Sequence, residues 1–209
     1  MNPRLYLGLL PWVVFSIVGR GTVGGVAWGA FAALAAALVI VAASARTRSM
    51  KDLEVFGVGL FSALAVWAVS DQHDPVGVLQ RFHGAIAVGA LALFAVVSLA
   101  FQPFTEPYAR EVVQRKYWTT GRFSRANVEL TLIWAVVFAA TAASVAAAGA
   151  LQTRLGTTVF AGLLPVAILL LGASQATIRW NDQFDGESMG IDALLNQGEL
   201  WDTRGGQTG

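Results

Sequence analysis

Long apolar blocks constrain this chain more than any other feature of its sequence. Six can be marked, and they run over Leu5–Gly19, Thr22–Ala43, Leu53–Val69, Phe82–Phe101, Val128–Ala148 and Thr157–Ile178. A helix needs about 20 apolar residues to cross a hydrocarbon core of about 30 Å. Only 13% of the 209 residues are charged, too few to cover a soluble domain, in which about 25% is usual. The blocks therefore predict an all-α membrane protein with about six transmembrane helices.

The first block, residues 5–19, is the least regular. It is short, carries Pro11 and ends at Gly19-Arg20-Gly21 without a small-residue cleavage site of the kind that follows a signal peptide. We expect a short kinked span that is retained, with a re-entrant segment as the alternative. No linker divides the six blocks, so residues 1–180 form one predicted transmembrane domain. Residues 181–209 form an acidic tail.

Cations are distributed unequally between the two sides of this six-span topology. One side receives Arg4, Arg46, Arg48, Lys51, Arg110, Arg115, Lys116, Arg122, Arg125, Arg179 and Arg204. The other side receives Arg20, Arg81 and Arg154. Cytoplasmic loops of membrane proteins are enriched in Lys and Arg. The bias predicts that the N-terminus, the C-terminus and the two basic loops are cytoplasmic.

The segment after the fourth block has the pattern of a helix lying at the membrane surface. Pro103 ends the preceding helix, Thr105 is suited to cap a new one, and Pro107 is tolerated in a first turn. The apolar face would carry Tyr108, Val112, Val113 and Tyr117, with cations beside it. We expect an amphipathic helix that binds anionic lipid or a protein partner. Its candidate binding residues are Phe104, Thr105, Tyr108, Arg110, Glu111, Arg115 and Lys116.

Polar residues in or next to the third and fifth blocks are candidates for contacts between helices or for ion coupling. Asn127, Thr131, Trp134 and Phe138 are spaced so that they share one stripe of a helix. Asn and Thr in a span commonly hydrogen-bond to a neighbouring helix. Glu54 and Glu129 lie near helix starts, where a salt bridge to a basic loop and proton or cation coupling are both open readings.

The runs Pro103-Phe104-Thr105 and Tyr108-Ala109-Arg110-Glu111, followed by the stripe that begins at Asn127, carry a resemblance. They resemble a widespread, largely uncharacterised bacterial inner-membrane family with a PFT-x-x-YARE motif. In layout, residues 5–150 are also similar to the intracellular septation protein A group of envelope proteins. The chain departs from the family pattern because residues 117–121 contain no proline. The resemblance implies a multi-pass protein of a bacterial inner membrane, and it implies no reaction.

Small residues are frequent on the expected helix faces, for example in Gly25-x-x-x-Gly29. In lipid, such residues let backbones approach closely, either within one chain or between two copies. The chain has no cysteine, which excludes disulfides and thiolate chemistry.

No constellation of residues indicates a metal, a cofactor, catalysis or nucleic-acid binding. We therefore expect an envelope protein that acts through packing and partner contacts, with a membrane-protein partner or a second copy as candidates. The alternative is a small channel or secondary transporter for an ion or small solute.

Overall fold

The computed structural model describes residues 7–19, 25–46, 51–70 and 77–179. The expected acidic tail, residues 181–209, lies outside the described residues. So do Arg4, Arg20, Arg48 and Arg204.

Nearly all of the described residues are helical. The helices are α2 (Leu10–Val18), α3 (Gly25–Arg46), α4 (Asp52–Ser70), α5 (Val78–Ser98), α6 (Glu106–Ala109), the 3₁₀ helix η1 (Arg115–Tyr117) and α7 (Gly121–Leu151). The last helix runs from Arg154 to Arg179. It begins as α8 (Arg154–Thr158), passes through one turn of π-helix, η2 (Val159–Leu163), and continues as α-helix over residues 164–179.

Five of these helices are long and apolar enough to cross a membrane: α3, α4, α5, α7 and the helix Arg154–Arg179. The sixth predicted span is not confirmed. The first block forms α2, a helix of 9 residues. At 1.5 Å per residue it is about 14 Å long, roughly half of a hydrocarbon core. It packs against α3 and α5 with Trp12 and Phe15 buried.

Helix α7 begins seven residues before the predicted start at Val128. Thr120 caps it, because its side chain accepts a hydrogen bond from the backbone N–H of Phe123. Arg122 and Arg125 therefore lie on the first turns of this helix. Hydropathy marked only the apolar part, whereas the cap fixes where the helix starts.

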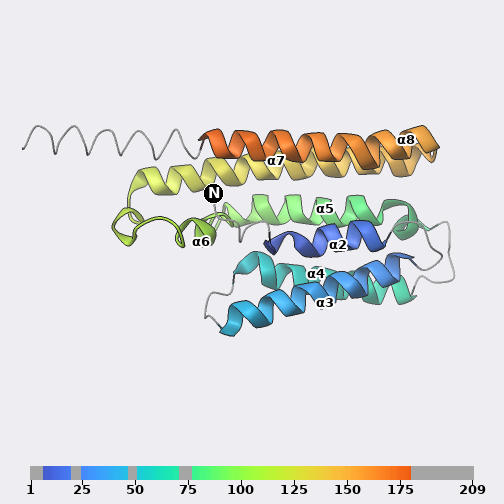
Figure 1. Cartoon of the computed structure of the whole chain (residues 1–209), viewed down its shortest axis with the longest axis horizontal. Coiled ribbons are helices and arrows are strands. Elements are labelled where there is room, and N and C mark those ends of the chain that lie inside the picture. Colours follow the sequence, from blue (N-terminus) through green and yellow to red (C-terminus); the bar gives the residue numbers. More distant parts are fainter. Residues whose placement is uncertain (1–6, 20–24, 47–50, 71–76, 180–209) are drawn as a thin grey trace, which may run out of the picture.

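The long helices lie side by side with their axes roughly aligned, so that the two ends of the bundle are distinct (Figure 1). They form two packed units. The first unit consists of α2, α3 and α4, and the second consists of α5, α7 and the helix Arg154–Arg179.

The seam between the two units is made mainly by side chains that reach α5. The rings of Phe56 and Phe94 stack with their centroids 4.5 Å apart. Trp12 donates its indole N–H to the carbonyl oxygen of Ala87 over 3.2 Å. A buried indole N–H usually has a hydrogen-bond partner, and this bond ties α2 to α5.

Small residues let the helices within this chain approach closely. A Cβ atom on Gly29 would lie 2.9 Å from the Cα of Gly19, and one on Gly149 would lie 2.6 Å from the carbonyl oxygen of Arg81. Gly25 and Gly29 are both buried. The Gly25-x-x-x-Gly29 face is therefore used inside the chain, which is the first of the two alternatives that the spacing left open.

The π-turn η2 follows from Pro165. The backbone N–H of Leu164 bonds to the carbonyl of Val159, five residues back. In that register the carbonyl of Phe160 would face residue 165, but proline has no N–H to donate. Ser144 of α7 donates its hydroxyl to this carbonyl over 2.6 Å. A side chain from the neighbouring helix thus satisfies the backbone group that Pro165 leaves open.

Candidate functional site

One end of the bundle holds most of the described cations, and we call it the basic end. It contains the end of α3, the start of α4, the start of α7 and residues 99–120, which link α5 to α7 (Figure 1). We call residues 99–120 the connector. The Lys and Arg residues of these elements and of the last helix's C-terminus are Arg46, Lys51, Arg110, Arg115, Lys116, Arg122, Arg125 and Arg179. At the opposite end the described cations are Arg81 and Arg154.

The connector is not the single amphipathic helix that its sequence predicts. It contains the four-residue helix α6 and the three-residue η1, separated by turns, with extended backbone at Gln114. Within the connector, Tyr108 is buried, whereas Val112 is 53% exposed. The two side chains therefore do not share one apolar face. Burial of Tyr108 against protein rather than lipid is the physical reason for the difference.

Thr105 ties the connector to α7 instead of capping α6. Its hydroxyl lies 3.1 Å from the carbonyl oxygen of Asn127, 3.3 Å from the Asn127 Oδ1 and 3.0 Å from the hydroxyl of Thr131. Asn127 in turn donates its side-chain N–H to the carbonyl of Phe123 over 2.8 Å. All three polar side chains are buried. The stripe on α7 thus bonds to the connector, where the spacing had predicted a neighbouring span.

Aromatic rings extend this anchor into the bundle. Phe104 is 2% exposed, and its ring centroid lies 6.1 Å from that of Phe94 and 6.5 Å from that of Phe138. Trp134 stacks on Phe138 at 5.4 Å. The indole Nε1 of Trp134 is buried and has no hydrogen-bond partner among the described residues. Glu129 is half-buried on the same helix.

Lys51 joins the other side of the connector to α4. Its Nζ lies 2.8 Å from the Oε1 of Glu111 in the connector and 3.9 Å from the Oε1 of Glu54 on α4. It also lies 4.8 Å from the centroid of the Tyr108 ring, within range of a cation–π contact. The Lys51 and Glu54 side chains are each only 4% exposed. This role could not be predicted from the sequence, where Lys51 is one of several cations in a basic loop.

Two carboxylates share one ammonium in this buried cluster. A charge removed from water is costly unless it is paired and hydrogen-bonded. The side chain of Glu111 is 22% exposed and keeps some contact with solvent. The Oε2 of Glu54, in contrast, is buried without a hydrogen-bond partner among the described residues. Glu54 is therefore the less satisfied of the two carboxylates.

Tyr108 completes the cluster. A Cβ atom on Gly8 would lie 2.8 Å from the Tyr108 hydroxyl oxygen, so glycine leaves the space that this phenol occupies. Burial raises the pKa of Tyr108 well above its ordinary value, and the negative charges of Glu54, Glu111 and Asp52 raise it further. The phenol therefore stays neutral and cannot add a third negative charge beside Lys51.

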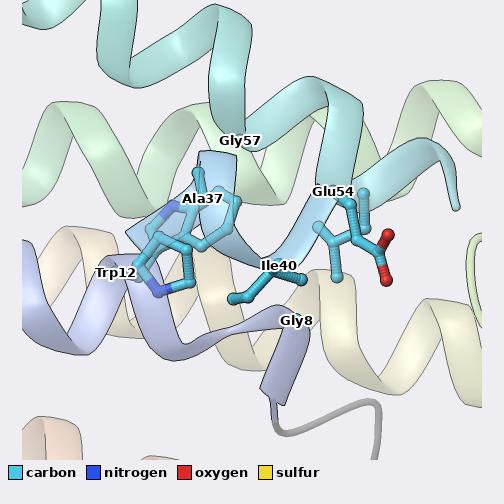
Figure 2. A pocket seen from close by; sticks show the side chains of 8 residues that line it. Gly8, Trp12, Ala37, Ile40, Glu54 and Gly57 are labelled. Atoms are coloured by element: carbon cyan, nitrogen blue, oxygen red, sulfur yellow. The ribbon is translucent and has the colours of Figure 1, made fainter. Parts of the chain in front are cut away.

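A narrow apolar groove runs from this cluster between α2, α3 and α4. It is too narrow to hold a water molecule, and its lining residues are Gly8, Pro11, Trp12, Ala37, Ile40, Leu53, Glu54 and Gly57. Figure 2 shows Trp12 and Glu54 at opposite ends, with the carboxylate of Glu54 directed away from Trp12. Glu54 is the one charged side chain among these lining residues.

The outer side of the connector is positively charged. Arg110 pairs with Glu106 and lies 5.3 Å from the ring centroid of Trp118, and the Nζ of Lys116 lies 4.8 Å from that of Tyr117. Arg110, Arg115 and Lys116 are all exposed. Glu106 and Glu111 are less exposed than Arg110, at 14% and 22% against 42% for the side chains. The connector thus turns its acids toward the bundle and its cations outward.

The part of the chain that the structure describes has an all-helical fold, and its five long apolar helices are compatible with a multi-pass membrane protein. Comparison of the chain with protein-family models, with curated proteins and with solved structures finds no match.

Proposed function

We propose that this chain is a multi-pass protein of a bacterial inner membrane whose basic end faces the cytoplasm and binds anionic lipid headgroups. The arrangement of the connector carries this proposal. Glu111 pairs with the buried Lys51 and Glu106 pairs with Arg110, whereas Arg115 and Lys116 are exposed at the end of the bundle without an acidic partner among the described residues. The cytoplasmic leaflet carries anionic lipid, and each nearby cation contributes about 1 kcal/mol to binding such a surface.

The aromatic rings of the connector support the same assignment. Tyr117 and Trp118 are half-buried beside Lys116 and Arg110. Trp and Tyr favour the headgroup region of a bilayer, because they combine an apolar ring with a polar atom. The combination of exposed cations and aromatic rings is therefore suited to the depth at which phosphate groups lie.

In this proposal the protein acts through contacts in the membrane and performs no reaction. A solute path through the bundle has less support. Thr141 donates its hydroxyl to the carbonyl of Val137, and Ser144 donates to that of Phe160. The hydrogens of these deep hydroxyls are already bonded to backbone carbonyls, so both side chains have a packing role within the bundle. The last helix exposes Leu163, Leu170 and Leu171, a surface suited to lipid or to a partner helix.

The test uses the full chain in nanodiscs made from equal parts of phosphatidylglycerol and phosphatidylcholine. After transfer to mild detergent, the phosphatidylglycerol and phosphatidylcholine that stay bound are counted by mass spectrometry. We expect the wild type to retain several phosphatidylglycerol molecules for each phosphatidylcholine. The triple variant Arg110→Gln, Arg115→Gln, Lys116→Gln should lose most of that preference.

The matched control changes Arg81→Gln and Arg154→Gln at the opposite end and should keep the preference. Raising the salt concentration should weaken retention by the wild type, since these contacts are exposed to water. Equal retention of both lipids by the wild type would refute anionic-lipid binding. Loss of preference in the control as well would show that any reduction in positive charge suffices, which argues against a site on the connector.

A further inference from the structure

The connector joins the two units of the bundle at the basic end. Thr105 bonds to Asn127 and Thr131 on α7, which belongs to the second unit. Glu111, five residues beyond α6's first residue, bonds to Lys51 at the start of α4, which belongs to the first unit. The Thr105 anchor is neutral and fully buried, whereas Glu111 is partly exposed. The Glu111 contact is therefore the more easily released of the two.

Lys51 and Glu54 belong to the same helix start and keep their spacing whatever the connector does. The carbonyl of Lys51 accepts hydrogen bonds from the backbone N–H groups of Glu54 and Val55 over 3.0 and 3.2 Å. This fixes the lysine backbone one turn from Glu54. The Lys51 ammonium is closer to Glu111 than to Glu54, at 2.8 against 3.9 Å. Glu54 is thus a second partner that is always within reach.

We infer that Lys51 is a two-position latch that holds the connector closed on Glu111 and releases it by moving onto Glu54. In the closed position Lys51 pairs with Glu111, and Glu54 keeps a buried oxygen without a hydrogen bond. In the open position a shift of the ammonium satisfies Glu54, so that the buried lysine never loses a carboxylate partner. Without Glu54, opening would leave an unpaired charge in an apolar environment, which is strongly unfavourable.

In this latch Glu54 favours opening of the connector, whereas a residue that only stabilised the cluster would favour the closed state. Two carboxylates that share one ammonium repel each other, so Glu54 weakens the closed state. It also stabilises the open state by receiving Lys51. Removing its charge should close the connector more tightly. Removing the charge of Glu111 should open it.

The test measures opening by the reactivity of one introduced cysteine in this cysteine-free chain. Ala109 is 4% exposed and lies at the end of α6, so Ala109→Cys should react with a water-soluble maleimide only when the connector lifts. The full chain is studied in neutral detergent, where binding of anionic lipid plays no part. Adding Glu111→Gln should raise the labelling rate about tenfold or more, and adding Glu54→Gln should lower it about threefold or more.

Two controls separate opening from unfolding. Glu106→Gln removes an acid of the same connector that pairs with Arg110 outside the cluster, and it should leave the rate unchanged within about twofold. Ala135→Cys, in place of Ala109→Cys, reports on the buried core of α7 and should stay unlabelled in every background. Faster or unchanged labelling with Glu54→Gln would overturn the latch and leave Glu54 as a structural ion-pair partner. Labelling at position 135 in the Glu111→Gln background would overturn it too, because the effect would then be global unfolding.

Discussion

Replacing Thr105 by valine removes the hydroxyl that ties the connector to α7 and keeps the shape of the side chain. The hydroxyl can donate one hydrogen bond and accept another, and it has three oxygen atoms of Asn127 and Thr131 within 3.0–3.3 Å. A polar contact in a membrane protein is worth about 0.6–2 kcal/mol. Leaving a buried acceptor unsatisfied costs about 1–3 kcal/mol in its own right. We expect Thr105→Val to lower the free energy of unfolding by about 1–3 kcal/mol.

The assay is thermal unfolding of the purified chain in mild detergent. A loss of this size corresponds to a midpoint lowered by about 2–12 °C for a chain of this length. Thr105→Ser keeps the hydroxyl and should recover most of the loss. Thr119→Val, at an exposed position of the same connector, should change the midpoint by less than about 2 °C. A Thr105→Val protein that melts with the wild type would refute the anchor.

The remaining predictions concern orientation and packing. Reporter fusions after residues 50 and 120 and at the C-terminus should report the cytoplasm, and a fusion after residue 75 the periplasm; a periplasmic reporter after residue 120 would contradict the proposed orientation. Ser144→Ala leaves the carbonyl of Phe160 unsatisfied and should cost about 1–3 kcal/mol in the same thermal assay, whereas Ser174→Ala, at an exposed position, should cost little. Gly149→Val would place a Cβ atom 2.6 Å from the carbonyl of Arg81 and should prevent α5 and α7 from packing, measured as loss of the monodisperse peak in size-exclusion chromatography; Gly59→Val, where a Cβ atom meets nothing within 4 Å, is the matched control.

The helical class and the positions of the long helices could be predicted from the sequence, because hydropathy reports directly on lipid exposure. The first block shows what hydropathy cannot predict. Residues 5–19 are apolar enough to be marked as a span, but the described helix α2 has 9 residues. Hydropathy measures how apolar a segment is and does not measure whether one continuous helix is long enough to cross a bilayer. The start of α7 was missed for the converse reason, since a Thr120 cap and charged first turns are helical without being apolar.

The connector shows why the candidate site was predicted only in part. The sequence pointed to Thr105, Asn127 and Thr131 by residue type, and the structure brings all three together. The pattern nevertheless predicted one helix, because a helical wheel places Tyr108 and Val112 on one face. A long-range contact gives a different result, since Tyr108 packs beside Gly8, a hundred residues earlier in the chain, and does not share a face with Val112. The pairing of Lys51 with Glu111 also joins residues that lie far apart in the chain, and it has no local signature.

Because the chain is synthesised from its N-terminus, the two contacts that hold the connector can form only after particular helices have been made. Lys51 and Glu54 emerge early, at the start of α4, whereas Glu111 follows only after α5 is complete. Thr105 has no partner until Asn127 and Thr131 are made in the first turns of α7. The connector can therefore be fastened at both ends only after four of the five long helices have begun to form. A connector fastened at both ends therefore requires that the two units have already met, and an unfastened one would expose Tyr108 and Lys51, which are buried in the folded chain.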